Sequence, residues 1–380
     1  MPNWTLVPGL SAANRAKLPE EINPEVTTKT LGYHPSLDGI RGIAILLVIG
    51  IHLANWPPGG YFGVQIFFVL SGFLITTILL EQHGSQGRIS LRKFYLRRCR
   101  RLFPALVVAL AGYLLLNVVR LATSSSLGWD ELKPRLVAVA VGITYCKDLT
   151  LAFGHHHHAD ALNPLWSLGV EEQFYIVWPL LLILLLRSRR SLVFWLVLIL
   201  GLAVVNRSRL ALDGDSWWRL YTGPDANAVS VIAGCLAASL HLAGVRLHSR
   251  VSNVLIATSI VVLIVFCGFN SLYSHLLISV PVVAAASVCL ILAAVRTGPL
   301  ARALAFRPLV FTGRISYSLY LWHLIIAYGT PLRLLPTIVL CFVVAWLSYK
   351  FVEQPFLRRK PQVAAVDQPA SPAAALAPSA

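Results

Sequence analysis

Charged residues are scarce in this sequence. Asp, Glu, Lys and Arg make up 13% of its 380 residues and 57% are hydrophobic, whereas soluble domains carry about 25% charged residues. Acidic residues are the scarcer sign, 16 against 32 basic ones, so the net charge is +16. These values exclude an ordinary soluble globular domain. We interpret the chain as an all-α polytopic membrane protein, with the lipid bilayer as one of its partners.

Several other features are missing. No C-x-x-C pair occurs among the six cysteines, so neither a disulfide framework nor a zinc site is indicated. Residues 1–35 lack an apolar stretch after a basic start, so we expect no cleaved signal peptide. The four consecutive histidines from His155 to His158 cannot all approach one ion from a helix, and we expect a solvated loop and no metal. Because the basic residues lie in short clusters between apolar runs, we also expect no nucleic-acid partner.

Ten apolar runs are long enough to cross a bilayer core, which takes about 20 helical residues. They lie near residues 38–55, 61–80, 103–122, 170–186, 191–206, 226–244, 251–269, 276–295, 309–328 and 335–352. Loops rich in Lys and Arg stay in the cytoplasm. Seven basic residues between positions 88 and 101 therefore place that loop, and the amino terminus, on the cytoplasmic side.

An eleventh apolar run, residues 136–153, is interrupted by Lys147 and Asp148. If it crossed, the four later basic clusters would all lie outside; if it does not, all four lie in the cytoplasm. We therefore predict about ten transmembrane helices with both termini cytoplasmic, and a re-entrant or outer-surface segment at 136–153. The expected domains are a polar segment at 1–35, a transmembrane domain at 36–357 and a disordered Ala/Pro-rich tail at 358–380.

Residues 37–52 place Asp38, Arg41 and His52 in one otherwise apolar run. An ionisable side chain in hydrocarbon costs roughly 2.5 to 3.5 kcal/mol, so we expect these groups to face the bundle interior or a wet cavity. Arg41 and His52 are about three helical turns apart and share one face, so both could line one pore. Asp38 is expected to pair with Arg41 at i, i+3.

Five separated stretches resemble the acyltransferase family 3 membrane O-acyltransferases. They are LDGIRGIAILLVIGIH (37–52), YFGVQIFFVLSGFLIT (61–76), FYLRRCRRLFP (94–104), NPLWSLGVEEQFYIVWPLLL (163–182) and ISYSLYLWH (315–323). The resemblance covers most of residues 35–357. It implies a multi-pass enzyme of the inner, cytoplasmic membrane. Such an enzyme moves an acyl group, expected to be acetyl, from acyl-CoA to a hydroxyl of a cell-envelope glycan or a small glycosylated metabolite.

The resemblance also implies roles for particular residues. The family's Arg-x10-His pair falls on Arg41 and His52, and its Arg-x-x-Arg pair on Arg98 and Arg101. Imidazole can take a hydroxyl proton near neutral pH, so His52 is the expected base or acyl carrier, and both roles stay open. Arg98 and Arg101 are expected to hold the acyl-CoA pyrophosphate, because guanidinium binds phosphate bidentately. Basic residues beside a span are also topology signals.

Three further positions enter with the resemblance. It points to Glu171, expected at the outer end of the fourth span, as a group that orients the acceptor or pairs with His52, although the helix dipole also favours a carboxylate there. His323 is either a second polar lining residue or part of an aromatic anchor. Asn227 stands two residues after Asp225, where the family tends to have a basic residue, so the role of this outer loop stays open.

Two other functions are compatible with the sequence. A transporter could use the intramembrane Arg and His as an ion or substrate pathway, and would be expected to have broken helices and an internal repeat, of which the sequence shows no convincing sign. An acceptor-binding or assembly protein without chemistry would tolerate the loss of His52.

Overall fold

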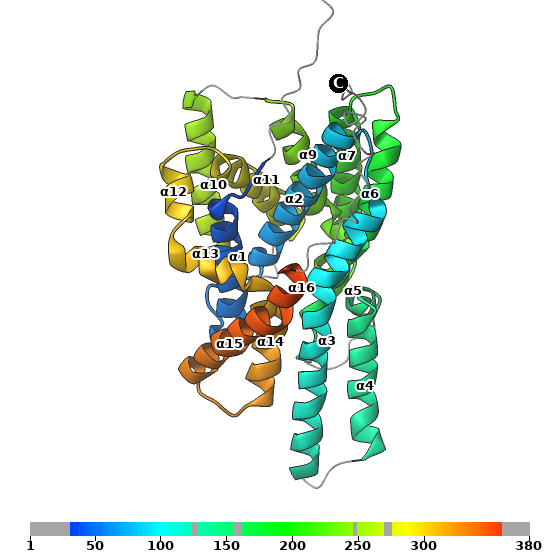
Figure 1. Ribbon diagram of the computed structural model, residues 1–380, viewed down its shortest axis with the longest axis vertical. Helices are drawn as coiled ribbons and strands as arrows, with labels where there is room; N and C mark the ends of the chain where they lie inside the picture. The colour runs from blue at the N-terminus through cyan, green and yellow to red at the C-terminus, as the bar shows by residue number, and fades with distance from the viewer. Residues whose placement is uncertain (1–30, 124–127, 155–160, 246–248, 270–275, 359–380) are drawn as a thin grey trace, which may run out of the picture.

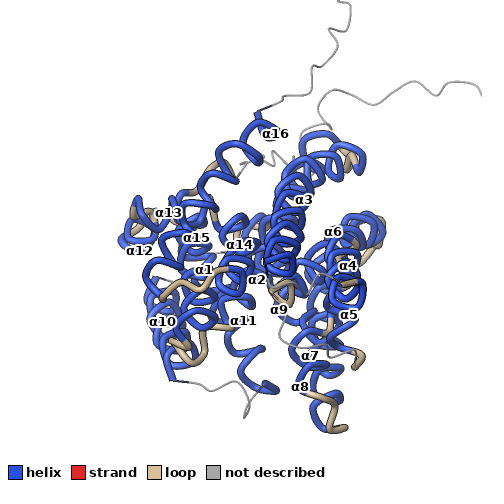
Figure 2. Tube along the Cα trace, turned by 90° about the horizontal axis from the view of Figure 1, so that it is seen from below, coloured by secondary structure: helices blue, strands red, loops and turns tan. Residues whose placement is uncertain are grey.

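The computed structural model describes residues 31–123, 128–154, 161–245, 249–269 and 276–358. Over these ranges the chain forms helices and connecting loops and no strand (Figure 2). Eight helical stretches within them are long and apolar enough to cross a membrane. They are α1 (Pro35–Ala54), α2 (Phe62–Gln86), α3 (Leu91–Thr123), α6 (Leu165–Leu186), α7 (Leu192–Leu212), α8 with α9 (Trp217–Thr222 and Pro224–Leu242), α10 (Ser249–Phe269) and α15 with η2 and α16 (Leu334–Ser348, Tyr349–Glu353 and Gln354–Arg358).

Two further predicted spans also fall on helices. The pair α13 (Arg307–Arg314) and α14 (Ser316–Gly329) passes the same test together, but bends by 70° at its break. Helix α11 (Leu276–Ala294) contains a shorter apolar stretch, and α12 (Pro299–Leu304) follows it. The predicted all-α polytopic fold is therefore confirmed. The count of ten spans and the cytoplasmic termini stay predictions.

Residues 136–153 fall on two helices instead of one span. Helix α4 (Trp129–Ile143) returns along α3 (Figure 1), and the Arg135 side chain donates to Asn117 Oδ1 at 3.0 Å. The chain then turns at Tyr145, whose φ is 55°, into the short α5 (Lys147–Ala152). Within the described ranges α4 is not among the helices apolar enough to cross. This path favours a re-entrant segment over an eleventh span.

Glycines allow the central helices to approach closely. A Cβ on Gly72 of α2 would clash with the carbonyl oxygen of Val231 on α9, and a Cβ on Gly234 of α9 would clash with that of Val69. Gly63 of α2 approaches the backbone of α1 in the same way. Small residues are the usual means by which membrane helices come this close. The backbones of α1, α2 and α9 are consequently held at fixed separations.

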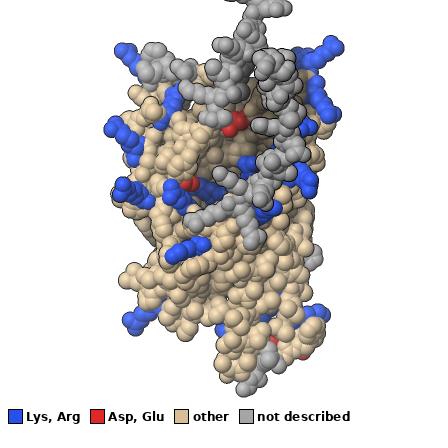
Figure 3. Space-filling view, in the orientation of Figure 1, with Lys and Arg blue, Asp and Glu red and all other residues tan. Residues whose placement is uncertain are grey.

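Helices α1, α2 and α14 occupy the middle of the bundle. In Figure 2, α6, α7 and α8 lie on one side of them, and α10, α12, α13 and α15 lie on the other. On the face in Figure 3, Lys and Arg clearly outnumber Asp and Glu, and most gather in its upper part.

Candidate functional site

His52 lies in the last turn of α1 and faces α14. Its Nδ1 is 3.1 Å from Nε2 of His323, and the two rings stack with their centroids 5.1 Å apart. His323 is fully buried at 0% exposure, whereas His52 is exposed. The structure thus pairs the expected base with a second imidazole, and His323 is part of this pair and not an interfacial anchor.

Arg41 lies on the same side of α1 as His52. Its Nη2 donates to Ser316 Oγ at 3.2 Å, and Ser316 belongs to α14, as does His323. The prediction that Arg41 and His52 share a face is confirmed. The expected pairing of Asp38 with Arg41 is wrong, because Asp38 Oδ2 accepts from the Tyr33 hydroxyl at 2.9 Å and lies 3.7 Å from Nε of Arg314.

Three guanidinium groups, those of Arg41 on α1 and of Arg98 and Arg101 on α3, lie near one another. Arg98 and Arg101 lie on the first turns of α3, which begins at Leu91, so they belong to the helix and not to the loop before it. The charge of Arg101 interacts with those of Arg41 and Arg98. Nε of Arg41 and Nε of Arg98 are buried and have no hydrogen-bond partner within the described part of the chain. Clustered guanidiniums with free donors suit a phosphate-bearing ligand.

Glu171 lies within this arginine cluster (Arg41, Arg98 and Arg101) and not beside His52. Its two carboxylate oxygens accept from Ser71 Oγ at 2.9 Å and from the Tyr175 hydroxyl at 2.8 Å. The guanidinium of Arg98 stacks on the Tyr175 ring, 3.7 Å from its centroid. Because α6 already begins at Leu165, Glu171 is not at the outer end of a span. No hydrogen bond joins it to His52 among the residues that the structure describes.

A polar stripe along α6 was not predicted from the sequence. Ser167, Glu171 and Tyr175 recur every four residues, so they lie on one helix face. Ser167 Oγ is 2.6 Å from the Tyr320 hydroxyl, and the Tyr320 ring packs against His323 with centroids 5.6 Å apart. The stripe therefore connects the arginine cluster to the histidine pair. Its spacing of four was the signal in the sequence.

Glu353 is a second residue that was not predicted from the sequence. It ends the π-helical turn η2 and is 3% exposed. Its Oε1 accepts from Ser318 Oγ, and its charge interacts with Arg101 and Arg41. Single π-helical turns occur frequently at functional sites. A lone acidic residue at the end of an apolar run was the available signal.

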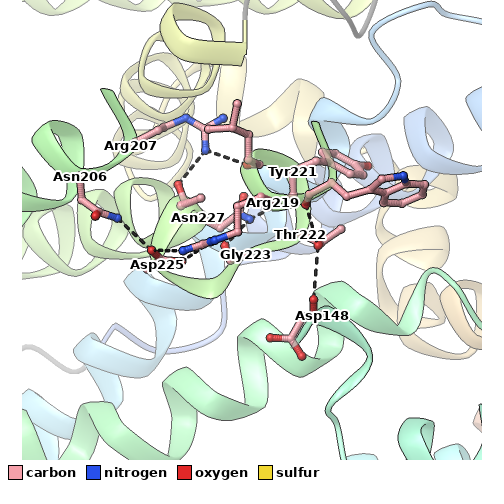
Figure 4. A network of polar contacts seen from close by, with 12 residues as sticks. Asp148, Asn206, Arg207, Arg219, Tyr221, Thr222, Gly223, Asp225 and Asn227 are labelled. Carbon is pink, nitrogen blue, oxygen red and sulfur yellow. Dashed lines mark hydrogen bonds and ion pairs between the residues drawn. The ribbon is translucent and has the colours of Figure 1, made fainter. Parts of the chain in front are cut away.

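The loop around Asp225 forms a separate network (Figure 4). Both oxygens of Asp225 bind Arg219, each at 2.6 Å, and Asn206 donates to the same carboxylate at 3.0 Å. Asn227 donates instead to the backbone carbonyls of Tyr221 and Gly223. The basic partner of Asp225 therefore precedes it by six residues. The network ties α7, α8 and α9 together.

Asp148 of α5 is fully buried against α6. Gln173 Nε2 donates to both of its carboxylate oxygens, at 3.1 and 2.9 Å. Burial raises the pKa of Asp148 to about 6, and the hydrogen bonds from Gln173 act in the opposite direction. This contact fixes α5 beside the polar stripe.

A cavity of about 850 Å³ lies between α3, α4, α5 and α14, apart from the histidine pair. Ile325, Tyr328 and Gly329 line it from α14. At about 100° per residue they lie on the side of this helix opposite His323. The cavity is therefore not the chamber in which His52 acts. As for metals, the described residues contain no group of three His, Cys, Asp or Glu able to hold an ion, and His155 to His158 lie outside those residues.

Helices α1, α3, α6 and α14 thus define a multi-pass membrane protein with a basic and imidazole-containing centre. The sequence model of a family described as an acyltransferase domain matches residues 34–352. The chain belongs to this family, and the predicted resemblance is confirmed.

The names of curated relatives agree with this family membership. Peptidoglycan O-acetyltransferase OatA of Listeria monocytogenes serovar 1/2a (strain ATCC BAA-679 / EGD-e) is 32% identical over 353 residues, which cover 85% of this chain and 56% of the relative. Putative peptidoglycan O-acetyltransferase YrhL of Bacillus subtilis (strain 168) is 34% identical over 360 residues, 85% of this chain and 55% of the relative. Putative O-acetyltransferase SAS0844 of Staphylococcus aureus (strain MSSA476) is 32% identical, with 86% and 58% covered. The chain thus spans a little more than half the length of these relatives. No solved structure matches it significantly.

Proposed function

We propose that this chain is an O-acyltransferase of the inner, cytoplasmic membrane, and that it moves an acetyl group from acyl-CoA to a hydroxyl of a cell-envelope glycan. Family membership and the names of the relatives, which include a peptidoglycan O-acetyltransferase, support the reaction and the acceptor class. The donor is inferred from the arginine cluster. The transmembrane domain at 36–357 carries all of these residues.

The observation that carries the proposal is the arrangement along α1. Arg41 belongs to the arginine cluster and His52 lies eleven residues further on, roughly 16 Å away along the helix. Acyl-CoA has its phosphates at one end and its thioester at the other. Arg98 and Arg101 hold the pyrophosphate, Arg41 neutralises charge between the two ends, and His52 receives the acyl end.

The chemistry needs one unprotonated imidazole nitrogen. In one route, this nitrogen of His52 takes the proton of the acceptor hydroxyl, the oxygen attacks the thioester carbonyl, and the CoA thiolate leaves and is protonated. In the other, the same nitrogen attacks the thioester carbonyl and the CoA thiolate leaves; the acceptor hydroxyl then attacks the acyl-imidazole, and the released imidazole takes up its proton. Glu171 acts in either route by holding the Arg98 side of the cluster through Tyr175.

The test is acetyl transfer by purified protein in liposomes, with acetyl-CoA labelled in the acetyl group and soluble peptidoglycan fragments as acceptor. His52→Gln keeps approximate volume and hydrogen bonding but supplies no base, so transfer should fall by a factor on the order of a hundred or more. His52→Ala should be equally inactive, whereas Arg41→Lys should retain more activity than either, because it preserves the charge. Near-parent transfer by a folded His52→Gln protein would refute the assignment.

One observation favours the transporter alternative. The α13–α14 pair bends by 70°, and a broken span of this kind is expected of a transporter. The same liposomes separate the two functions: a transporter would accumulate labelled acetyl-CoA or glycan inside without releasing CoA, and an acyltransferase would release CoA in step with acceptor modification.

A further inference from the structure

His323 makes contacts that determine which of its nitrogens carries the proton. Its Nδ1 lies 2.7 Å from the carbonyl oxygen of Tyr320 and 3.2 Å from that of Leu319. A carbonyl oxygen can only accept a hydrogen bond, so Nδ1 is the protonated nitrogen. In a neutral imidazole the other nitrogen, Nε2, must then be an acceptor.

His323 is neutral because, among the residues that the structure describes, no acidic side chain forms an ion pair or a hydrogen bond with its ring. It is 0% exposed, and its hydrogen-bond partners are two carbonyl oxygens and the imidazole of His52. An isolated buried cation is far more costly than a neutral, hydrogen-bonded group. Nε2 of His323 therefore presents a lone pair to its partner.

That lone pair points at Nδ1 of His52, 3.1 Å away. His52 must donate there, so in its neutral form, the form that can act as a base or nucleophile, the proton is on Nδ1 and Nε2 is unprotonated. We propose that His323 is a positioning residue that holds His52 in the tautomer with a free Nε2, the atom that receives the hydroxyl proton or the acyl group. This inference rests on the proposed function for what His52 does, but not for the tautomer itself.

The packing around His323 keeps the pair from rotating. The Tyr320 ring covers His323, and the Tyr320 hydroxyl donates to the carbonyl of Pro164 at 2.7 Å while lying 2.6 Å from Ser167 Oγ. The role resembles that of the acid which orients the histidine in a Ser-His-Asp triad. Here the orienting group is neutral. It fixes the tautomer and, when His52 takes up a proton, accepts a stronger hydrogen bond.

Two variants of His323 separate the acceptor from the ring. His323→Phe keeps a ring for stacking but has no acceptor, so kcat should fall by roughly tenfold to hundredfold while the KM for acetyl-CoA stays within about twofold of the parent value. His323→Gln provides a carbonyl oxygen to His52 and a donor to the backbone, and it should recover a substantial part of the lost kcat. His241→Phe is the matched control, because His241 packs on Phe73 away from the pair.

The tautomer is read directly from ¹⁵N NMR of protein labelled in the histidine rings, with the His52 signals assigned by their loss in His52→Gln. The parent protein should show a protonated Nδ1 and an unprotonated Nε2 at His52, and His323→Phe should lose that preference. An Nε2-protonated His52 in the parent, or unchanged kcat and tautomer in His323→Phe, would overturn the inference. An active His52→Gln protein would instead refute the proposed function, because the NMR result does not depend on turnover.

Discussion

The guanidinium of Arg98 makes several different contacts at once. Its guanidinium stacks on Tyr175, interacts with the charge of Glu171, and keeps Nε free of any partner among the described residues. A planar cation held flat on an aromatic ring has its donor edges available in the plane. A Lys at this position would keep the charge, but it would lose the stacking on Tyr175 and the planar pair of donors that binds phosphate bidentately.

Replacement of Arg98 or Arg101 by Ala should raise the KM for acetyl-CoA. Loss of a charge-assisted hydrogen bond costs about 1.5 to 3 kcal/mol, which corresponds to roughly a tenfold to hundredfold change. Lys should restore only part of the loss. The control is Arg97→Ala, because Arg97 is exposed on the same turn of α3. The measurement is initial rate against acetyl-CoA concentration in liposomes; a double Ala variant with parent kinetics would mean that these arginines only orient the chain in the membrane.

For single residues, the sequence could predict which side chains share a helix face but not which partners they bind. Arg41 and His52 share a face because eleven residues make about three turns, and this follows from helix geometry alone. Asp38 lies beside Arg314 of α13 instead of pairing with Arg41, and Glu171 bonds Ser71 of α2 instead of His52. Those contacts depend on where α1, α2, α6 and α13 lie relative to one another, which the hydrophobic pattern does not determine.

For whole helices too, the sequence could not predict which elements pack together, and α5 and α6 are the example. The apolar pattern indicated a span starting near residue 170, but α6 begins at Leu165 and packs its first turns against α5. Buried Asp148 accepts from Gln173, and its Oδ1 would lie 2.5 Å from a Cβ on Gly169. The two charges that interrupted residues 136–153 were therefore a sign of a buried turn, and the sequence alone could not show what the turn packs against.

The contact of Asp148 predicts a dependence of stability on pH. Its pKa is raised to about 6 in the folded protein, compared with about 3.9 when unfolded. The folded state therefore binds this proton more tightly, so stability should rise as the pH falls from above 6 towards 4 and should lose that gain as the pH rises through 6. Asp148→Asn removes the titration while preserving the shape.

The measurement is the thermal unfolding midpoint in detergent at pH 7.5 and pH 5, for the parent and for Asp148→Asn. The difference between the two proteins isolates Asp148 from the other groups that titrate. As the pH is lowered, the midpoint of the parent protein should rise relative to that of the Asp148→Asn variant. A constant difference across this range would show that the Asp148 pKa is not raised.

For the whole molecule, the orientation in the membrane depends on whether the number of crossings is even or odd. Eight helical stretches of the described chain pass the test for a span, the bent α13–α14 pair makes a ninth candidate, and α11 is the short tenth one. Ten crossings put both termini on one side, and nine put them on opposite sides. Composition was enough to predict a polytopic membrane protein. Length and hydropathy do not determine whether the short helix α11 and the bent α13–α14 pair cross the membrane.

The positions of the basic clusters predict that both segments cross, which gives an even number of membrane crossings. With residues 136–153 re-entrant, all four later clusters lie in the cytoplasm, so reporters fused after Arg190 and after Lys360 should both read cytoplasmic. A reporter within His155 to His158 should read external, and one at Gly128, beyond the end of α3, serves as a control because it is external whether or not 136–153 crosses. An external reading at Arg190 would restore the eleventh span. A cytoplasmic reading at Arg190 with an external one at Lys360 would instead mean that α11 or the bent pair enters the membrane without crossing it. The arginine cluster would still face the cytoplasm, where acyl-CoA is supplied, because α1, α3 and α6 all precede these two helical segments.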